Sequence, residues 1–307
     1  MKRVFLINRK SGSGISRRAI ERLEEYFRLR GGSFEALLPE SREEAVRQTR
    51  SALAQGAGQI VAVGGDGTAN AALNGFLDQD KLVNPEACLA VAQAGSGSDY
   101  FRGLINGQRH DWREIVLRPN VRRVDIGRVE PLAERAIEPL YFLNMATFGF
   151  AAEVVRRKSA MSLWWPTAAR YLLPTLTGLL SVRPARLRLR ADGGELTRQC
   201  FCLIVAKGAY SGGGMKFGHD VALDDGQFEL TLFQPMPAWK MILKTPKLYS
   251  GALDSEPNVE KHRSAVVEID ADPPFLFECD GDVIGAAPVR LRVIPRALPV
   301  CFPLGAR

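Results

Sequence analysis

Short apolar runs alternate with amphipathic stretches along roughly the first 118 residues of the chain. Apolar runs predict buried strands at residues 3–7, 33–38, 60–63 and 88–92. Helical spacing of apolar residues and capping patterns predict helices over residues 17–29, 41–54 and 68–77. Strands that alternate with helices in this way predict an α/β domain with a doubly wound parallel sheet, which binds ligands at the carboxyl ends of its strands.

The pattern changes after residue 118, where most apolar runs are short and several alternate with polar residues. We expect strands at residues 121–129, 140–144, 186–190, 201–205, 228–233, 265–269, 275–279 and 289–293. This half therefore predicts a mostly antiparallel β-sandwich. We place a nucleotide-binding domain at residues 1–122 and a β-rich lipid-substrate domain at 123–295, with the tail 296–307 packing back on the first domain. The active site is expected in the cleft between them.

Residues 151–180 form the only long helix candidate that the pattern gives in the second half, and Pro166 and Pro174 are expected to break it. Its segments 161–166 and 171–173 are unusually apolar and are flanked by basic residues. No run of about 18 apolar residues survives the prolines and Arg170, which excludes a transmembrane helix here. Two interpretations stay open: helices packed on a sheet edge, or an amphipathic surface that touches the bilayer or admits an acyl chain.

Composition excludes a few classes of protein but does not identify the function. A hydrophobic content of 46% with 24% charged residues is typical of a globular chain rather than a disordered one. The net charge of +7 favours anionic partners such as nucleotides or an anionic membrane surface, but no nucleic-acid-binding motif occurs, so nucleic acid is not expected as a partner. Five cysteines without a CxxC pair do not suggest a disulfide framework and fit a reducing cytosol. The sequence leaves open whether the chain forms a homodimer.

The centre of the pattern is the run Gly64-Gly65-Asp66-Gly67-Thr68, which follows the apolar strand at 60–63. Glycines let the backbone approach an anion closely, and the first N–H groups of the helix that follows have no partner inside it. A carboxylate beside phosphates is expected to need a divalent cation, or else to order the loop by accepting backbone N–H groups. A plain tight turn with an Asp cap is the alternative.

Two further glycine-rich loops, at residues 8–14 and 95–99, follow other predicted strands. In a parallel sheet these strand ends meet at one edge, so we expect the three loops to share the phosphates of one nucleotide. None of the loops is a Walker loop, because Gly-Lys-Ser/Thr does not occur, and none has the full GxGxxG spacing of a dinucleotide fingerprint.

Residues 64–68 match the GGDGT signature shared by diacylglycerol kinases, sphingosine kinases, NAD kinases and, more loosely, phosphofructokinases. Other segments resemble, in order, the motifs of the diacylglycerol kinase catalytic-domain family in its bacterial lipid kinase branch. These segments are residues 8–12 (NPxxG), 95–100 (GTGNDF), 144–153, 212–216 with 223–226 (GGGM and DDG), and 279–282 (DGE). The likeness covers nearly the whole chain and implies an N-terminal domain like those of NAD kinases and phosphofructokinases.

The resemblance implies transfer of the γ-phosphoryl group of ATP to a hydroxyl of a lipid such as diacylglycerol, with Mg²⁺. The residues that would bind the nucleotide are Asn8, Gly64, Gly65, Asp66, Gly67, Thr68, Gly95, Ser96, Asp99 and Arg102. Metal ligands would be Asp224 and Asp225, with Asp66 beside the metal. Asp282, with Asp280, would carry the catalytic role, and Asp282 is the expected general base. The protein would work in the cytoplasm, at the inner face of the membrane.

The chain departs from the family pattern at several positions. Ser98 stands where the family has Asn, His219 where it has Pro, and Asp282 where it has Glu, which shortens the proposed base by one methylene. Two alternatives follow: an NAD kinase-like small-molecule kinase, or a catalytically silent protein that binds nucleotide and lipid. Against an NAD kinase, the chain lacks the Asn-Glu pair of that family.

Overall fold

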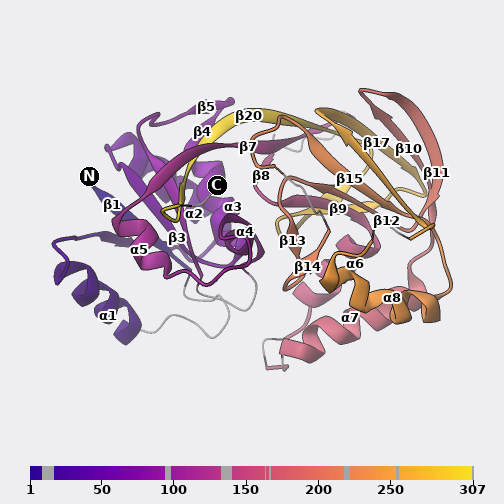
Figure 1. Cartoon of the computed structure of the whole chain (residues 1–307), viewed down its shortest axis with the longest axis horizontal. Helices are drawn as coiled ribbons and strands as arrows, with labels where there is room; N and C mark the ends of the chain where they lie inside the picture. Colours follow the sequence, from indigo (N-terminus) through magenta and orange to yellow (C-terminus); the bar gives the residue numbers. More distant parts are fainter. Residues whose placement is uncertain are drawn as a thin grey trace. The chain divides into compact units, whose positions relative to one another are not determined.

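The computed structural model describes residues 1–8, 17–93, 98–132, 140–162, 164–165, 167–217, 222–253 and 256–305. The chain divides into two compact units. Unit 1 comprises Met1–Ile126, Gly212–Gly214 and Ile294–Arg307, and unit 2 comprises Gly127–Ser211 and Met215–Val293. In Figure 1 the indigo and purple elements belong to unit 1 and most of the pink and orange elements to unit 2.

The first part of the chain contributes these elements in order: β1 (Arg3–Ile7), α1 (Arg17–Arg28), β2 (Glu35–Leu37), α2 (Arg42–Ala54), β3 (Gln59–Gly64), α3 (Asp66–Phe76), β4 (Leu77–Asp78), β5 (Lys81–Leu82), β6 (Cys88–Gln93), α4 (Asp99–Leu104) and α5 (Trp112–Leu117). Later elements are β7 (Asn120–Pro131), β8 (Leu140–Phe142), β9 (Met145–Gly149), α6 (Phe150–Ser159), α7 (Thr167–Ser181), β10 (Ala185–Ala191), β11 (Gly194–Cys200), β12 (Cys202–Ala206), β13 (Tyr210–Ser211), β14 (Met215–Lys216), β15 (Phe228–Phe233), α8 (Ala238–Ser250), β16 (Val259–Ser264), β17 (Val266–Asp272), β18 (Leu276–Cys279), β19 (Asp282–Ala286) and β20 (Val289–Phe302).

The sheet of unit 1 has the strand order β2-β1-β3-β6, and each of these neighbouring pairs is parallel. The end of β20 adds to it, because Val300 pairs in parallel with Leu89 of β6. Every residue of β3 is buried, which explains its continuous apolar run. The capping box opens α2 as the sequence predicts: the Ser41 hydroxyl accepts a hydrogen bond from the Glu44 N–H at 3.1 Å.

Small residues allow α3 to pack closely inside unit 1. The helix is buried from Thr68 to Phe76, and its sequence is rich in alanine and glycine. A Cβ atom on Gly75 would lie 2.5 Å from the Cβ of Thr49 in α2, so only glycine allows this approach of the two helices. The close packing fixes α3 against β3, and with it the turn at residues 64–66 that begins the helix.

Unit 2 is a sandwich of two antiparallel sheets. One has the order β16-β15-β12-β9-β18-β19, and the other contains β11, β10 and β17 with the first part of β20. Inward residues of both sheets, such as Leu203 and Phe277 from the first and Leu189 and Ile269 from the second, share one core. The predicted fold class, a parallel α/β region followed by an antiparallel β-sandwich, is confirmed.

The six-stranded sheet is covered on its outer face by three helices. Cys202 and Ile204 of β12 pack there with residues of α6, α7 and α8, whereas Leu203 and Val205 face the sandwich. Strand β12 is thus buried on both faces, which accounts for its unbroken apolar sequence. The second sheet instead alternates: in β10 the leucines are buried and the arginines exposed.

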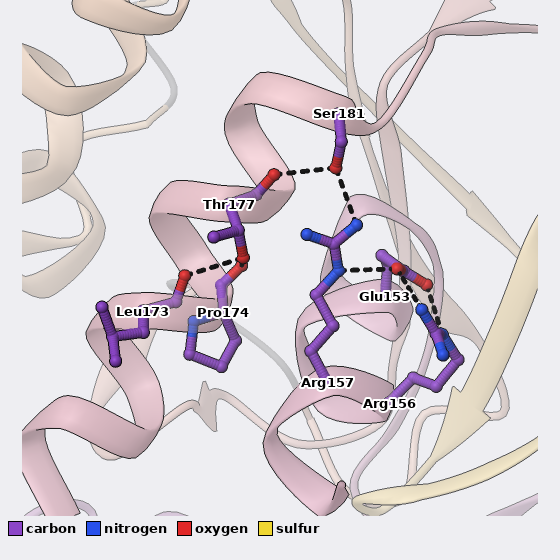
Figure 2. Close-up of polar contacts among 7 residues, drawn as sticks. All are labelled: Glu153, Arg156, Arg157, Leu173, Pro174, Thr177 and Ser181. Atoms are coloured by element: carbon purple, nitrogen blue, oxygen red, sulfur yellow. Dashed lines mark hydrogen bonds and ion pairs between the residues drawn. The ribbon is translucent and has the colours of Figure 1, made fainter. Parts of the chain in front are cut away.

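The helix prediction for residues 151–180 was partly wrong. The segment forms two helices, and Pro174 lies inside α7 rather than ending it. Proline removes one backbone donor from the helix. In the same stretch the Thr177 hydroxyl makes a bond within the helix, to the Leu173 carbonyl at 2.8 Å (Figure 2). Arg157 of α6 donates to Ser181 of α7 at 2.7 Å and so joins the two helices. Helix α8 also contradicts the expectation that 151–180 holds the only long helix of this half.

Candidate functional site

The N-terminus of α3 is built from the GGDGT run. Gly65 is the N-cap residue, and among the described residues no side chain caps the helix there, so none of these side chains occupies its first N–H groups. Gly64 ends β3, and a Cβ atom at that position would lie 2.2 Å from Thr68 Oγ1, so a larger residue displaces the threonine. Asn8 Nδ2 donates to the same Thr68 oxygen at 3.4 Å. Three predicted nucleotide-binding residues therefore meet at one point.

The carboxylate of Asp66 holds the start of helix α4. Its Oδ2 accepts a hydrogen bond from the Asp99 N–H at 3.2 Å, and its Oδ1 accepts one from the Tyr100 N–H at 3.1 Å. These are the first N–H groups of α4, which Asp66 can reach because β3 and β6 are neighbours. Asp66 therefore has the loop-ordering role that the sequence left open beside a metal role.

Asp99 links this region to the GGGM motif. The side chain is 3% exposed; its Oδ1 accepts from Arg102 at 2.9 Å and its Oδ2 from the Gly213 N–H at 2.8 Å. Gly214 has φ +107°, and a Cβ atom there would lie 2.2 Å from the Arg102 guanidinium. Segments that are more than a hundred residues apart in the sequence thus form one hydrogen-bonded network in unit 1.

In unit 2 the Asp280 carboxylate fixes a turn. Its two oxygens accept hydrogen bonds from the backbone N–H groups of Leu143 (2.7 Å), Asn144 (2.9 Å) and Met145 (3.0 Å). Asp280 is 6% exposed and has a left-handed backbone with φ +49°. Asp280 therefore orders the loop that presents Asp282, at the start of β19.

Glu278 is a buried carboxyl that the sequence analysis did not select. It is 4% exposed; its Oε1 accepts from the Thr147 hydroxyl at 2.6 Å and its Oε2 from the Gly281 N–H at 2.7 Å. Desolvation raises the pKa of Glu278 to about 7, although both hydrogen bonds oppose the shift. A charged residue inside the apolar strand 275–279 was the signal that could have drawn attention to it.

The two carboxylates predicted to bind metal differ in their surroundings. Asp225 accepts a hydrogen bond at 2.9 Å from the ammonium of Lys207, whose side chain is fully buried. Burial by itself raises the pKa of Asp225, but the hydrogen bonds from Lys207 and the Gln227 N–H outweigh it, and the pKa lies below its usual value. Asp224 is exposed. Within the part of the chain that the structure describes, no three His, Cys, Asp or Glu side chains are placed to hold a metal ion.

The structure thus brings together Asn8, Gly64, Thr68, Asp66, Asp99 and Arg102 in unit 1, and separately Asp280 and Asp282 in unit 2. Gly95 and Ser96 lie outside the described residues, as does His219. Ser98 is described: its hydroxyl is buried and has no hydrogen-bond partner among the described residues. The roles that the sequence analysis gave to these residues stay predictions.

Two family models match the chain. The model of the diacylglycerol kinase catalytic domain matches residues 2–129, and the model described as the YegS C-terminal NAD kinase beta sandwich-like domain matches residues 144–302. A protein of Chromohalobacter salexigens named "Probable lipid kinase YegS-like" is 25% identical over 264 residues, which cover 86% of this chain and 82% of that protein. A diacylglycerol kinase of Mycobacterium tuberculosis is 26% identical over 302 residues, which cover 97% of this chain and 94% of the relative.

Solved structures agree on the fold. A diacylglycerol kinase from Bacillus anthracis superposes with a TM-score of 0.71 at 15% identity and covers 100% of this chain and 98% of its own. A yeast NADH kinase complexed with NADH reaches a TM-score of 0.56 at 9% identity, with 99% of this chain and 84% of the yeast chain covered. At these identities the likeness concerns the fold alone. The two domain matches confirm the resemblance drawn from the sequence, and the chain belongs to the family that joins a diacylglycerol kinase catalytic domain to a YegS-type β-sandwich domain.

Proposed function

We propose that the protein is a kinase that transfers the γ-phosphoryl group of ATP to a hydroxyl of a membrane lipid such as diacylglycerol. The observation that carries the proposal is the network around Asp66 and Asp99. It joins the GGDGT turn, the start of α4 and the glycine loop 212–214, which are three motifs of this family. The names of the relatives, lipid kinase and diacylglycerol kinase, support the same reaction class.

The triphosphate would bind at the N-terminus of α3. Among the described residues no side chain caps this 11-residue helix, whereas the first N–H groups of α4 already donate to Asp66. The Thr68 hydroxyl and the Asn8 amide lie at the same helix end and can donate to phosphate oxygens. The Ser98 hydroxyl, which is buried and has no hydrogen-bond partner within the described part of the chain, lies in the same unit and would gain a partner when a nucleotide is bound. Arg102 would balance phosphate charge, since its guanidinium remains one-third exposed beside Asp99.

Mg²⁺ would arrive with the nucleotide rather than occupy a cage of protein side chains. The described carboxylates of unit 1 near α3, Asp66 and Asp99, both accept hydrogen bonds on each oxygen, which leaves them suited to hold metal-bound water. Mg²⁺ commonly keeps several waters and binds substrate phosphates with few protein ligands. When bound, the ion would supply charge neutralisation on the β- and γ-phosphates.

Asp282 would accept the proton of the lipid hydroxyl. It follows a turn that is held at two points: the Asp280 carboxylate bonds to the backbone of residues 143–145, and Glu278 accepts from the Gly281 N–H. These bonds position Asp282 at the start of β19. Asp280 is the weaker candidate for this role because its two oxygens already accept three backbone N–H groups. The loose transition state of phosphoryl transfer demands positioning more than a strong base.

The lipid substrate would be reached by docking on an anionic membrane surface through the outer faces of α7 and α8. Ten large apolar side chains of these helices and of residues 164–165 are exposed, and they make up more than half of the exposed large apolar residues of the described chain. They are Trp164, Trp165, Leu172, Leu173, Leu176, Leu180, Trp239, Ile242, Leu243 and Tyr249. We call this set the apolar face. No helix of the described chain is both long and apolar enough to cross a bilayer.

Helical spacing explains why these residues form stripes. In α7, Leu172, Leu176 and Leu180 follow one another at intervals of four, while Leu179 packs on the sheet. In α8, Trp239, Ile242 and Leu243 point outward while Met241 and Leu248 pack on the sheet. Each helix is therefore apolar on two sides, and the outer side needs a partner.

The charges near the apolar face favour an anionic lipid surface as that partner. Helices α7 and α8 contain no acidic residue. Two carboxylates contact the helices of this side, and both are paired: Glu153 of α6 with Arg156 and Arg157 (Figure 2), and Glu256 with Lys244 and Lys247 of α8. These bonds, that from Arg156 foremost, hold the pKa of Glu153 near 2, so it stays paired at any physiological pH. A second copy of the chain is the competing partner.

The reaction is tested by incubating the protein with γ-labelled ATP, Mg²⁺ and defined lipids, including diacylglycerol, and by separating the organic phase. We expect labelled lipid, and a loss of roughly 10²–10⁴ in kcat for Asp282→Asn with little change in ATP affinity. If ATP binds but no lipid extract is labelled, the silent nucleotide-binding alternative replaces the proposal. Label transferred to NAD, in a parallel incubation with NAD in place of lipid, would identify a small-molecule kinase.

Membrane docking is tested by sedimentation with vesicles that contain phosphatidylglycerol or only phosphatidylcholine. Trp164→Ser/Trp165→Ser and, separately, Leu243→Ser should weaken binding to the anionic vesicles. Leu29→Ser, an exposed leucine of unit 1, is the matched control and should bind normally. Unchanged vesicle binding in both variants, together with loss of a dimer in analytical ultracentrifugation, would assign the apolar face to self-association.

A further inference from the structure

Lys207 is a fully buried lysine immediately after β12, and its ammonium is surrounded by oxygen atoms. The Nζ atom donates to the Ala222 carbonyl at 3.0 Å, the Gln227 carbonyl at 2.9 Å and Asp225 Oδ1 at 2.9 Å. An ammonium has three N–H donors, and these three acceptors match them. Residues 222–227 thus surround a positive charge that the protein itself supplies, the ammonium of Lys207.

This arrangement has the composition of a cation site. A carboxylate and two backbone carbonyls are oxygen ligands of the kind that Mg²⁺ and Ca²⁺ bind. The distances are those of N–H···O hydrogen bonds, whereas Mg²⁺ requires oxygens at about 2.1 Å in octahedral geometry. A divalent ion placed among these three oxygens would be repelled by the adjacent ammonium of Lys207. The oxygens that could bind the ion already accept hydrogen bonds from that ammonium.

The rest of the loop supports the same conclusion. Asp225 Oδ1 also accepts from the Gln227 N–H at 3.1 Å, so the carboxylate bonds both to the ammonium and to the loop backbone. Its other oxygen faces the guanidinium of Arg263 at 3.8 Å. The backbone N–H of Lys207 donates to the Asn144 carbonyl at 2.8 Å, which fixes the lysine at its own end. Two cations therefore neutralise Asp225, which the sequence analysis assigned to a metal site together with Asp224.

We propose that the Lys207 ammonium is the structural cation of the 222–227 loop, and that this loop folds without a bound Mg²⁺. The residues present do not fit the metal that the family resemblance implies at Asp224 and Asp225. The inference goes beyond the proposed reaction and does not depend on it, because it concerns the folded state in the absence of nucleotide and lipid.

The first test compares the melting temperature of the wild-type protein in EDTA with that in millimolar Mg²⁺ at matched ionic strength, without nucleotide. We expect a difference of less than about 1 °C. A saturable rise with Mg²⁺ that disappears in Asp225→Asn would overturn the proposal, whereas a rise that persists in Asp225→Asn shows that Mg²⁺ binds elsewhere and agrees with it.

The second test removes the ammonium. Lys207→Met leaves the Ala222 and Gln227 carbonyls and the Asp225 carboxylate without their shared donor, so the melting temperature should fall by about 5 °C or more. Lys240→Met, which removes an exposed ammonium of the same unit, is the control and should change it little. An unchanged melting temperature in Lys207→Met would refute the role of Lys207.

A double variant keeps the test decisive if Lys207→Met fails to fold. Lys207→Met/Asp225→Asn removes both members of the ion pair, so its melting temperature should fall by less than the sum of the falls in the two single variants. Asp225→Asn alone strands the ammonium and should also lower the melting temperature. If the effects of the two single variants simply add in the double variant, the ammonium and the carboxylate are not coupled and the proposal fails.

Discussion

The buried carboxyl of Glu278 predicts a pH dependence of stability that can be worked out from its surroundings. Burial raises its pKa from the ordinary value of 4.5 to about 7. The difference between these two pKa values makes ionisation of the carboxyl about 3 kcal/mol more costly in the folded chain than in the unfolded chain. The folded chain therefore holds this proton more tightly than the unfolded chain does.

The sign of the effect follows directly. Between pH 4.5 and about 7 the folded state binds more protons than the unfolded state, so the free energy of unfolding falls as the pH rises through this window. Carboxyls whose pKa is lowered by a partner, such as Glu153 and Asp225, act in the opposite direction. Their contribution is present above the unfolded pKa and is lost only at lower pH, so it does not mask the effect of Glu278.

Glu278→Gln isolates the contribution. The amide can keep both contacts, because its oxygen can accept from the Gly281 N–H and its nitrogen can donate to the Thr147 hydroxyl. We expect calorimetric unfolding curves of the variant to lose the decline between pH 4.5 and 7, with the variant more stable than the wild type by up to about 3 kcal/mol at pH 8.

Glu195→Gln is the matched control, since it removes an exposed carboxylate on β11 that pairs with Arg190. Its pH profile should follow that of the wild type. The reasoning is refuted if wild type and Glu278→Gln show the same dependence between pH 4.5 and 7, because the folded carboxyl would then titrate like one in water.

Three further predictions concern the motif loops. Gly64→Ala should abolish ATP binding in a calorimetric titration because the added Cβ displaces Thr68, whereas Gly103→Ala, where nothing lies within 4 Å, should bind ATP normally. Gly65→Val should likewise abolish ATP binding with the fold largely intact, because a side chain blocks the approach to α3; undiminished affinity would contradict this. Asp280→Asn should lower the melting temperature by several degrees, since the amide cannot accept all three N–H groups, while Asp282→Asn should lower kcat at nearly constant melting temperature.

Much of the fold could be predicted because the relevant signals are local. The apolar runs of β1, β3 and β6 and the capping box of α2 depend on neighbouring residues only, and the strands lie where they were expected. Helix α8 was not predicted because exposed apolar residues such as Ile242 and Leu243 lie among its lysines, so its sequence lacks the one-sided apolar pattern of an ordinary surface helix. Pro246 within it adds a second misleading signal.

The sequence predicts which residues belong to the candidate site, but not which hydrogen bonds they form. The sequence indicates that Asp66 and Asp99 belong near the same strand ends, since β3 and β6 are successive strands of one sheet. Which N–H groups Asp66 accepts depends on the register of those strands, in which Gly64 pairs with Gln93. The contact of Asp99 with Gly213 joins segments 114 positions apart, and no local pattern specifies it.

Lys207 shows most clearly what the sequence alone cannot predict. A lysine that follows an apolar strand is ordinarily a solvated residue at the strand end, and only the tertiary structure reveals that the 222–227 loop encloses it. The carboxylates of the motifs have the same property: Asp66, Asp225 and Asp280 each bond to the chain itself. A loss of activity on replacing one of them therefore does not identify a ligand of metal or substrate. Assignments in these loops need a stability measurement beside the kinetic one, because a disordered loop and a missing catalytic group lower turnover alike.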